Sequence, residues 1–296
     1  MSSSAAGIAQ TTIETSPIIN AHLHATFERN TTLASVLDEM NENHVQVAVL
    51  SGADKELALK WQEAAPGRFL VGASFPCTDG IYPRIYPCFA ESNGWPDLEW
   101  LKEQFASGNM HVMGELLYVY YGIPPTDERL QPYFALAAEM AIPVGVHAAD
   151  GPPVRGRPKG CCPNFRAEFG DPLLLKPVLE KHPTLKIWLI HAGEVRFHQQ
   201  AVALMREFPN VYADMSILNS VMPVDLHQNL LESFLNAGLE DRIMLGTDNM
   251  PVKDIVERLE RFEFLSNEQR RKIMFDNAAR FFDIEPTSAM PSTPTY

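Results

Sequence analysis

Residues 18–24 read IINAHLH, a short apolar run that ends in two histidines separated by one residue. In an extended strand, residues two positions apart point to the same side, so the imidazoles of His22 and His24 are expected to lie together. The apolar residues before them are typical of a strand that is buried on both faces. Two imidazoles on one face at the end of such a strand can share one metal ion.

Further apolar runs of this kind recur along the chain, and amphipathic stretches such as 33–40 and 252–262 separate them with apolar residues at helical spacing. Eight strands alternating with helices predict a parallel sheet of the α/β class, and eight is the number of strands that closes a barrel. We therefore expect a single (β/α)8 TIM barrel, whose strands lie at 17–20, 45–50, 69–75, 111–116, 142–147, 186–191, 210–214 and 242–245.

The barrel is expected to occupy residues 16–283 as one domain. Residues 1–15 are rich in Ser, Ala and Thr and are expected to form a flexible N-terminal segment, and residues 284–296 a flexible tail rich in Pro, Ser and Thr. Long loops are expected after strands 3, 4 and 5, at 76–96, 117–127 and 148–170. In such barrels, the loops after the strands build the active site.

Composition and charge narrow the function classes. A formal charge of −13 opposes binding to phosphate backbones, so nucleic acid is not an expected partner. No apolar run is long enough to span a membrane. The four cysteines form no C-x-x-C pair, which predicts free thiols, no disulfide framework and a cytoplasmic protein. No signal peptide is visible, although a processed exported protein is an alternative. Acidic barrels are often homodimers, which is our expectation for the assembly.

Residues that bind metals follow several strands. His147 ends the fifth run, His191 ends the sixth, Asp248 follows the eighth, and Glu115 lies near the end of the fourth. A barrel brings the carboxyl ends of all its strands to one mouth. The predicted metal ligands are therefore His22, His24, Glu115, His147, His191 and Asp248, which suffice for one or two divalent ions. Zinc is the first choice, with manganese, iron or cobalt as alternatives.

The stretches IINAHLH, MGELLYVYYGIPP, IPVGVHAADGPP, LKIWLIHAGE, NVYADMS and DRIMLGTDNMP together resemble the amidohydrolase superfamily, in particular its amidohydrolase-2 group of barrel-fold metal-dependent hydrolases. The resemblance spans roughly residues 17–282. It implies that His22 and His24 bind the first metal, that His147 and His191 are the histidines after strands 5 and 6, and that Asp248 is both ligand and proton shuttle. Asp248 and His191 are the catalytic candidates.

The resemblance leaves the number of metals open. In binuclear members a carboxylate or carboxylated lysine after strand 4 bridges the metals, and Glu115 occupies that place. Mononuclear members, including decarboxylases, lack the bridging acid and use four ligands resembling His22, His24, His147 and Asp248. His191 would then act as a base. Asn20 stands where the family often has Asp, and we expect it to orient the ligands rather than bind metal.

Weaker candidates lie in the loops. Arg155 and Arg166 belong to a cationic loop with Arg157 and Lys159 and could pair with a substrate carboxylate; a solvated loop is the alternative. Of the tyrosines after Glu115, which are Tyr118, Tyr120 and Tyr121, we take Tyr118 and Tyr121 as substrate-binding candidates, with packing as the alternative. Asp214 ends strand 7 and could approach the metals or serve the structure. Trp188 is expected in the core.

Four functions are compatible with these residues. The first is a hydrolase that uses metal-activated water on a small-molecule lactone, ester or amide, possibly one that carries a carboxylate. The second is a mononuclear metal-dependent decarboxylase of the same family, whose substrate carboxylate the cationic loop would hold. The third is a phosphoesterase resembling the TatD-type nucleases, which Glu115 favours and the charge opposes. The fourth is a barrel that has lost catalysis, against which the complete ligand set argues.

Overall fold

A computed structural model describes residues 17–25, 32–53, 57–77, 94–151 and 162–285 of the chain. Eight parallel strands form one sheet, and each strand pairs with the next along the chain. The eight predicted strands and the TIM barrel are therefore confirmed. The strands are β1 (Ile18–Leu23), β2 (Val45–Ala53), β3 (Phe69–Phe75), β4 (Val112–Leu116), β5 (Val144–His147), β6 (Ile187–Ile190), β7 (Val211–Asp214) and β8 (Ile243–Met244).

Hydrogen bonds between β1 and the residues after β8 close the barrel. The N–H of Ala21 donates to the carbonyl of Leu245 at 2.8 Å, and the N–H of Asp248 donates to the carbonyl of His22 at 2.9 Å. The second of these bonds lies at the carboxyl end of β1. It fixes the two ends of the barrel domain to each other at the place where His22, His24 and Asp248 are expected to meet.

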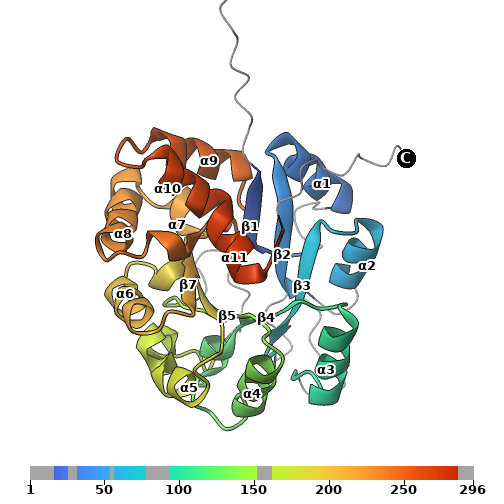
Figure 1. Ribbon diagram of the computed structural model, residues 1–296. Helices are drawn as coiled ribbons and strands as arrows, with labels where there is room; N and C mark the ends of the chain where they lie inside the picture. The colour runs from blue at the N-terminus through green and yellow to red at the C-terminus, as the bar shows by residue number, and fades with distance from the viewer. Residues whose placement is uncertain (1–16, 26–31, 54–56, 78–93, 152–161, 286–296) are drawn as a thin grey trace, which may run out of the picture.

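Helices surround the strands on the outside of the barrel (Figure 1). Their predicted positions agree with the structure at 33–40 and at 252–262, which fall on α1 and α9. The α-helices are α1 (Leu33–Glu42), α2 (Leu57–Ala64), α3 (Leu98–Ser107), α4 (Gln131–Glu139), α5 (Lys176–Lys181), α6 (His198–Glu207), α7 (Leu218–Val221), α8 (Val224–Asn236), α9 (Val252–Arg261), α10 (Asn267–Arg271) and α11 (Asn277–Phe282).

Side chains from strands on all sides of the barrel pack together in its interior. Because one cluster joins β1, β2, β4, β6 and β8, it fills the barrel rather than its outer face; its strand members include Ile19, Val49, Val112, Trp188 and Met244. Phe281 and Phe282 of α11 pack edge-on against Trp188. Helix α11, red in Figure 1, thereby closes the amino-terminal end of the barrel. Trp188 is a core residue, as predicted.

Side chains cap the starts of two helical segments in the second half of the chain. Ser266 forms a capping box with Gln269 at the start of α10, and the chain continues through a π-helical turn (Lys272–Asp276) into α11. Asp171 caps a 3₁₀ helix (Pro172–Leu175) by accepting from the N–H of Leu173. Pro177 stands in the first turn of α5, where the N–H that proline lacks is not needed for a helical hydrogen bond.

A buried histidine makes stability depend on pH. His227 in α8 is fully buried, and neither ring nitrogen has a hydrogen-bond partner among the described residues. Burial and the charge of Arg258 lower its pKa to about 4. As the pH falls below about 6.5, the unfolded chain takes up a proton that the folded chain refuses, so we expect about 1–2 kcal/mol of stability to be lost by about pH 5.

Urea unfolding at about pH 7.5 and about pH 5 measures this loss. The His227→Leu variant cannot titrate at this position, so its free energy of unfolding should change less between the two pH values than that of the wild type. Equal changes in the two proteins would contradict the assignment.

Four expectations concern the cysteines, a membrane span, the chain ends and the long loops. Cys77 and Cys162 are disulfide-bonded, so the prediction of free thiols is wrong for these two residues. None of the described helices is long and apolar enough to cross a membrane. Residues 1–16 and 286–296 lie outside the described residues, and the flexible ends expected at 1–15 and 284–296 stay predictions. Of the three long loops, only the one after β4 is described throughout, and it contains a 3₁₀ helix (Tyr118–Tyr121).

Candidate metal centre

The paired histidines of β1 meet Asp248 at the mouth of the barrel. The Nε2 atoms of His22 and His24 lie 2.9 Å apart, and Oδ1 of Asp248 lies 2.9 Å from Nε2 of His24 and 3.9 Å from Nε2 of His22. Both histidines are buried. Two imidazole nitrogens and one carboxylate oxygen at such distances form a group that could hold a metal ion.

A second group of the same kind lies on β4, β5 and the end of β6. Nδ1 of His147 lies 2.6 Å from Oε1 of Glu115, and Nε2 of His191 lies 3.8 Å from the same oxygen. The hydroxyl of Tyr120 lies 3.1 Å from Nε2 of His147. Glu115, His147 and His191 are all buried, and together they could hold a metal ion.

Glu115 joins the two groups because its oxygens face opposite ways. Oε2 lies 3.8 Å from Nε2 of His22 and 3.7 Å from Nε2 of His24, whereas Oε1 faces His147 and His191. The carboxylate therefore stands between the two sets of imidazoles. The six side chains predicted from the sequence are brought to one place, although they come from five different strand ends.

Two asparagines hold β1 against the segment after β8. Oδ1 of Asn20 accepts from the N–H of Thr247 at 3.1 Å, and its Nδ2 donates to Oγ1 of Thr247 at 2.8 Å. Oδ1 of Asn249 accepts from the N–H of His24 at 2.8 Å, and its Nδ2 donates to the carbonyl of His24 at 3.1 Å. Asn20 also accepts from the N–H of His22 at 3.2 Å, and its expected role in orienting metal ligands stays a prediction. The role of Asn249 was not predicted.

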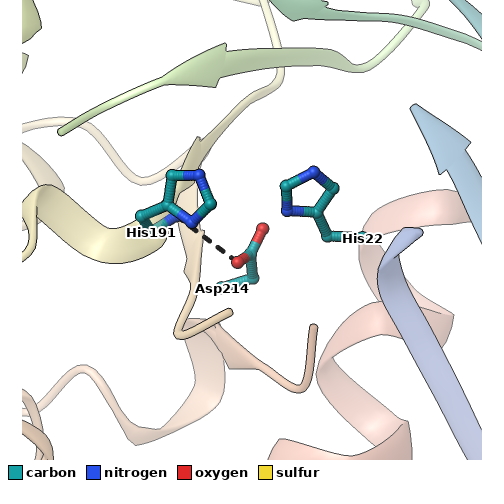
Figure 2. A group of neighbouring side chains, drawn as sticks. All are labelled: His22, His191 and Asp214. Atoms are coloured by element: carbon teal, nitrogen blue, oxygen red, sulfur yellow. Dashed lines mark hydrogen bonds between the residues drawn. The ribbon is translucent and has the colours of Figure 1, made fainter. Parts of the chain in front are cut away.

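Asp214 lies between His22 and His191 at the end of β7, and Figure 2 shows one of its carboxylate oxygens pointing up between the two rings. Its Oδ1 accepts from the N–H of Ser216 at 2.9 Å and from the N–H of His191 at 3.4 Å. The Ser216 hydroxyl donates to the same oxygen. Asp214 therefore joins the backbone after β7 to the backbone at the end of the neighbouring strand β6.

Several residues at this mouth have left-handed backbone conformations, which are uncommon for residues other than glycine. The φ angles are 68° at His191, 50° at Asp248 and 63° at Ile217. Such conformations cost about 1–3 kcal/mol each and persist only where the surrounding structure holds them. Their concentration beside the two groups of side chains is typical of a functional site.

The electrostatics of the site keep its carboxylates ionised and one of its histidines neutral. Burial lowers the pKa of His22 to about 4, so this imidazole is neutral at pH 7. Burial alone would raise the pKa of Glu115, but the hydrogen bond from His147 and the charges of the other histidines bring it down to about 2. Burial would lower the pKa of His191, but the charges of nearby carboxylates, chiefly Asp248 and Glu115, outweigh burial and raise this pKa. Buried carboxylates that favour a cation here suit a metal site.

The pKa of Asp248 is held well below its ordinary range. Burial acts in the opposite direction, but the hydrogen bond from His24 and the charges of His22, His24 and His191 prevail. At neutral pH the carboxylate is therefore ionised. An ionised carboxylate at the mouth of the barrel can bind a cation or accept a proton.

The weaker candidates are placed differently. Tyr118 and Tyr121 are buried in the main core, while Tyr120 lies against His147. Arg166 is exposed, and its Nη1 donates to the carbonyls of Asn164 and Phe165 in its own loop. Arg155 lies outside the described residues, as do Arg157 and Lys159. Binding of substrate by Arg155, Arg166, Tyr118 and Tyr121 stays a prediction.

The chain resembles solved structures over nearly its whole length. An uncharacterised TIM-barrel protein from Bordetella bronchiseptica has a TM-score of 0.66 at 17% identity, covering 90% of this chain and 99% of that one. A probable 2-pyrone-4,6-dicarboxylic acid hydrolase from Acinetobacter baumannii has a TM-score of 0.62 at 14% identity, with coverage of 90% and 99%. The 2,6-dihydroxybenzoate decarboxylase from Rhizobium has a TM-score of 0.61 at 16% identity, with coverage of 91% and 99%.

At these identities the structural likeness concerns the fold. A search of curated proteins found no match to the chain. A sequence model of the amidohydrolase family matches residues 89–284, about two thirds of the chain, and this family is metal-dependent. The chain therefore belongs to the amidohydrolase-2 group of the amidohydrolase superfamily.

Proposed function

We propose that the chain is a metal-dependent hydrolase whose site holds two divalent ions, one on each side of Glu115. The observation that carries this proposal is the position of Glu115, whose two oxygens face two separate sets of imidazoles. His22, His24 and Asp248 would hold one ion, and His147 and His191 the other, with Glu115 shared between them.

The donor set suits the proposed ions. Imidazole nitrogens and carboxylate oxygens are ligands that zinc accepts readily, and we propose zinc first, with manganese, iron and cobalt as alternatives. The ions would supply a hydroxide at neutral pH and polarise the carbonyl of the substrate. Among the residues of the chain, the ionised Asp248 would take up a proton at Oδ1 and return it to the leaving group. The neutral His22 can offer a lone pair to a cation.

The proposed substrate is a small molecule with a lactone, ester or amide bond and a carboxylate. Two of the structural relatives support this class, since the printed name of one is a hydrolase of 2-pyrone-4,6-dicarboxylic acid and that of another a decarboxylase of 2,6-dihydroxybenzoate. Both compounds named are carboxylated rings. We propose that the carboxylate is held at the rim of the barrel, where Arg166 lies.

The metal content of the purified protein is the first test. We expect about two equivalents of divalent metal per chain by elemental analysis, with loss of activity on chelation and recovery when zinc is added back. A folded protein that binds no metal and gains no activity from added metal would contradict the proposal.

A substrate panel is the second test, and it separates two reactions. Lactones, esters and amides with a carboxylate, including 2-pyrone-4,6-dicarboxylic acid, should be opened by water without release of carbon dioxide. Aromatic carboxylic acids, including 2,6-dihydroxybenzoate, should be left intact.

A mononuclear decarboxylase is the second candidate, supported by the decarboxylases among the structural relatives. His22, His24 and Asp248 form a group that could hold one ion without Glu115. Release of carbon dioxide from 2,6-dihydroxybenzoate, together with one equivalent of metal, would favour this function over hydrolysis.

A further inference from the structure

Ser216, two residues beyond the end of β7, is hydrogen-bonded to two of the proposed metal ligands at once. Its Oγ lies 2.9 Å from Nδ1 of His22 and 2.9 Å from Nδ1 of His191, and it also contacts Oδ1 of Asp214. The serine is fully buried. Because His22 belongs to β1 and His191 follows β6, one hydroxyl connects histidines from both proposed ion sites.

The number of protons available determines the direction of each bond. A serine hydroxyl has one proton to donate and two lone pairs that accept. The hydroxyl contacts Oδ1 of Asp214, and an ionised carboxylate oxygen can only accept, so the hydroxyl proton is donated there. Because the hydroxyl proton points at Asp214, only the two lone pairs of the Ser216 oxygen remain to contact the two imidazoles. Nδ1 of His22 and Nδ1 of His191 must then both be donors.

A separate contact gives the same result for His191. The backbone carbonyl of Ser216 lies 3.3 Å from Nδ1 of His191. A carbonyl oxygen can only accept, so this contact also requires a proton on Nδ1.

The opposite nitrogens face the proposed ions. Nε2 of His22 faces His24 and Oε2 of Glu115, and Nε2 of His191 faces Oε1 of Glu115. With the proton on Nδ1, a neutral imidazole has its lone pair on Nε2. We propose that Ser216 is a positioning residue that keeps the proton of both His22 and His191 on Nδ1 and so presents both Nε2 lone pairs to the two ions.

Two further observations support a specific positioning role for Ser216. His22, His191 and Asp214 form a group that could itself hold a metal ion, but the Ser216 hydroxyl lies among them, within hydrogen-bonding distance of all three. Ile217, the next residue, has a φ of 63°, which is rare for a β-branched side chain. The chain therefore adopts a costly conformation directly beside the serine.

The first experiment uses the protein with Ser216 unchanged and does not depend on enzymatic activity. The role inferred for Ser216 rests on the proposed two-ion site. The positions of the ring protons, however, can be measured in the metal-free protein. Nitrogen–proton NMR of uniformly ¹⁵N-labelled, metal-free protein is recorded at a pH above the raised pKa of His191, so that both rings are neutral, with signals assigned by single histidine substitutions. The spectra should show the single ring proton of His22 and of His191 on Nδ1. A lone proton on Nε2 of either residue would overturn the inference, whether or not the chain is a hydrolase.

The second experiment measures zinc affinity by titration of metal-free protein. Loss of a group that orients a metal ligand typically weakens binding about 10- to 100-fold, and we expect a loss of this size in Ser216→Ala. Ser233→Ala is the matched control, because the Ser233 hydroxyl lies 2.8 Å from Nε2 of the buried His198 on α6, away from the proposed ligands. It should bind zinc within about twofold of the wild type.

The proton positions in the Ser216→Ala variant separate positioning from packing. If Ser216 acts as inferred, the Nε2-protonated form of His22 should appear in this variant, because Nδ1 of His22 has lost its acceptor. Zinc affinity unchanged in Ser216→Ala, or weakened equally in Ser233→Ala, would overturn the inference.

Discussion

The Asp248→Asn variant is expected to lose about 10²- to 10⁴-fold in kcat, the range that a positioned acid–base group contributes. The reason is the state of the carboxylate. Asp248 is ionised because the hydrogen bond from His24 and the neighbouring histidines hold its pKa far below its ordinary range. Asparagine has nearly the same shape and still offers an oxygen, but it cannot accept and return a proton at this position.

Kinetics and elemental analysis of the same preparation separate the two roles of Asp248. Retained metal with a low kcat would identify proton transfer as the lost step, and loss of about one equivalent would identify binding of an ion. Asp38→Asn, the same change at an exposed position of α1, should leave kcat unaltered. Turnover within about threefold of the wild type in Asp248→Asn would show that this residue has neither role.

The Glu115→Gln variant is expected to bind one metal equivalent instead of two and to turn over about 10³-fold more slowly. A bound metal that polarises a carbonyl contributes several kcal/mol, and ~4 kcal/mol corresponds to that factor. The physical reason is that an amide presents one oxygen, whereas both oxygens of Glu115 face imidazoles. One of the two groups would then lack its shared ligand.

Glu128→Gln provides the matched control for this variant. Glu128 is exposed and lies in the segment after β4, the strand that carries Glu115. Its substitution should change neither metal content nor turnover. If Glu115→Gln also leaves both unchanged, the two-ion hydrolase is excluded and the mononuclear decarboxylase is favoured. The metal stoichiometry of Glu115→Gln thus decides between the two proposed reactions.

Much of the fold is readable in the sequence because of how parallel barrels are built. A strand buried on both faces must be apolar at nearly every position, so it appears as a short uninterrupted run such as residues 45–50. Eight such runs, alternating with helical stripes, leave few other arrangements. The ligands could be predicted for a related reason, since His147 and Asp248 stand at or just after the ends of such runs, and all strand ends meet at one mouth.

The residues that hold the ligands in place were harder to predict. The position of Asp214 at the end of a strand left open whether it approaches the metals or serves the structure, Ser216 reads as an ordinary polar residue after that strand, and Asn249 reads as part of a turn. Their roles depend on hydrogen bonds to groups that are distant in the sequence, such as the contact between Ser216 and His22 and the contacts of Asn249 with the backbone of His24. Of three neighbouring tyrosines, Tyr120 is the one that contacts His147, because a 3₁₀ helix turns its side chain that way. The periodicity of the sequence did not predict this helix.

By itself, the sequence determined the barrel, its strand count and the kinds of side chain that gather at its carboxyl end, because burial on both faces makes each strand a continuous apolar run. The tertiary structure alone decided that the two oxygens of Glu115 face different imidazoles and that one serine hydroxyl reaches both His22 and His191. A hydrogen bond requires its donor and acceptor to be placed within a fraction of an ångström and to point at each other. Between distant residues, such precision arises only when strands from opposite ends of the chain are packed together.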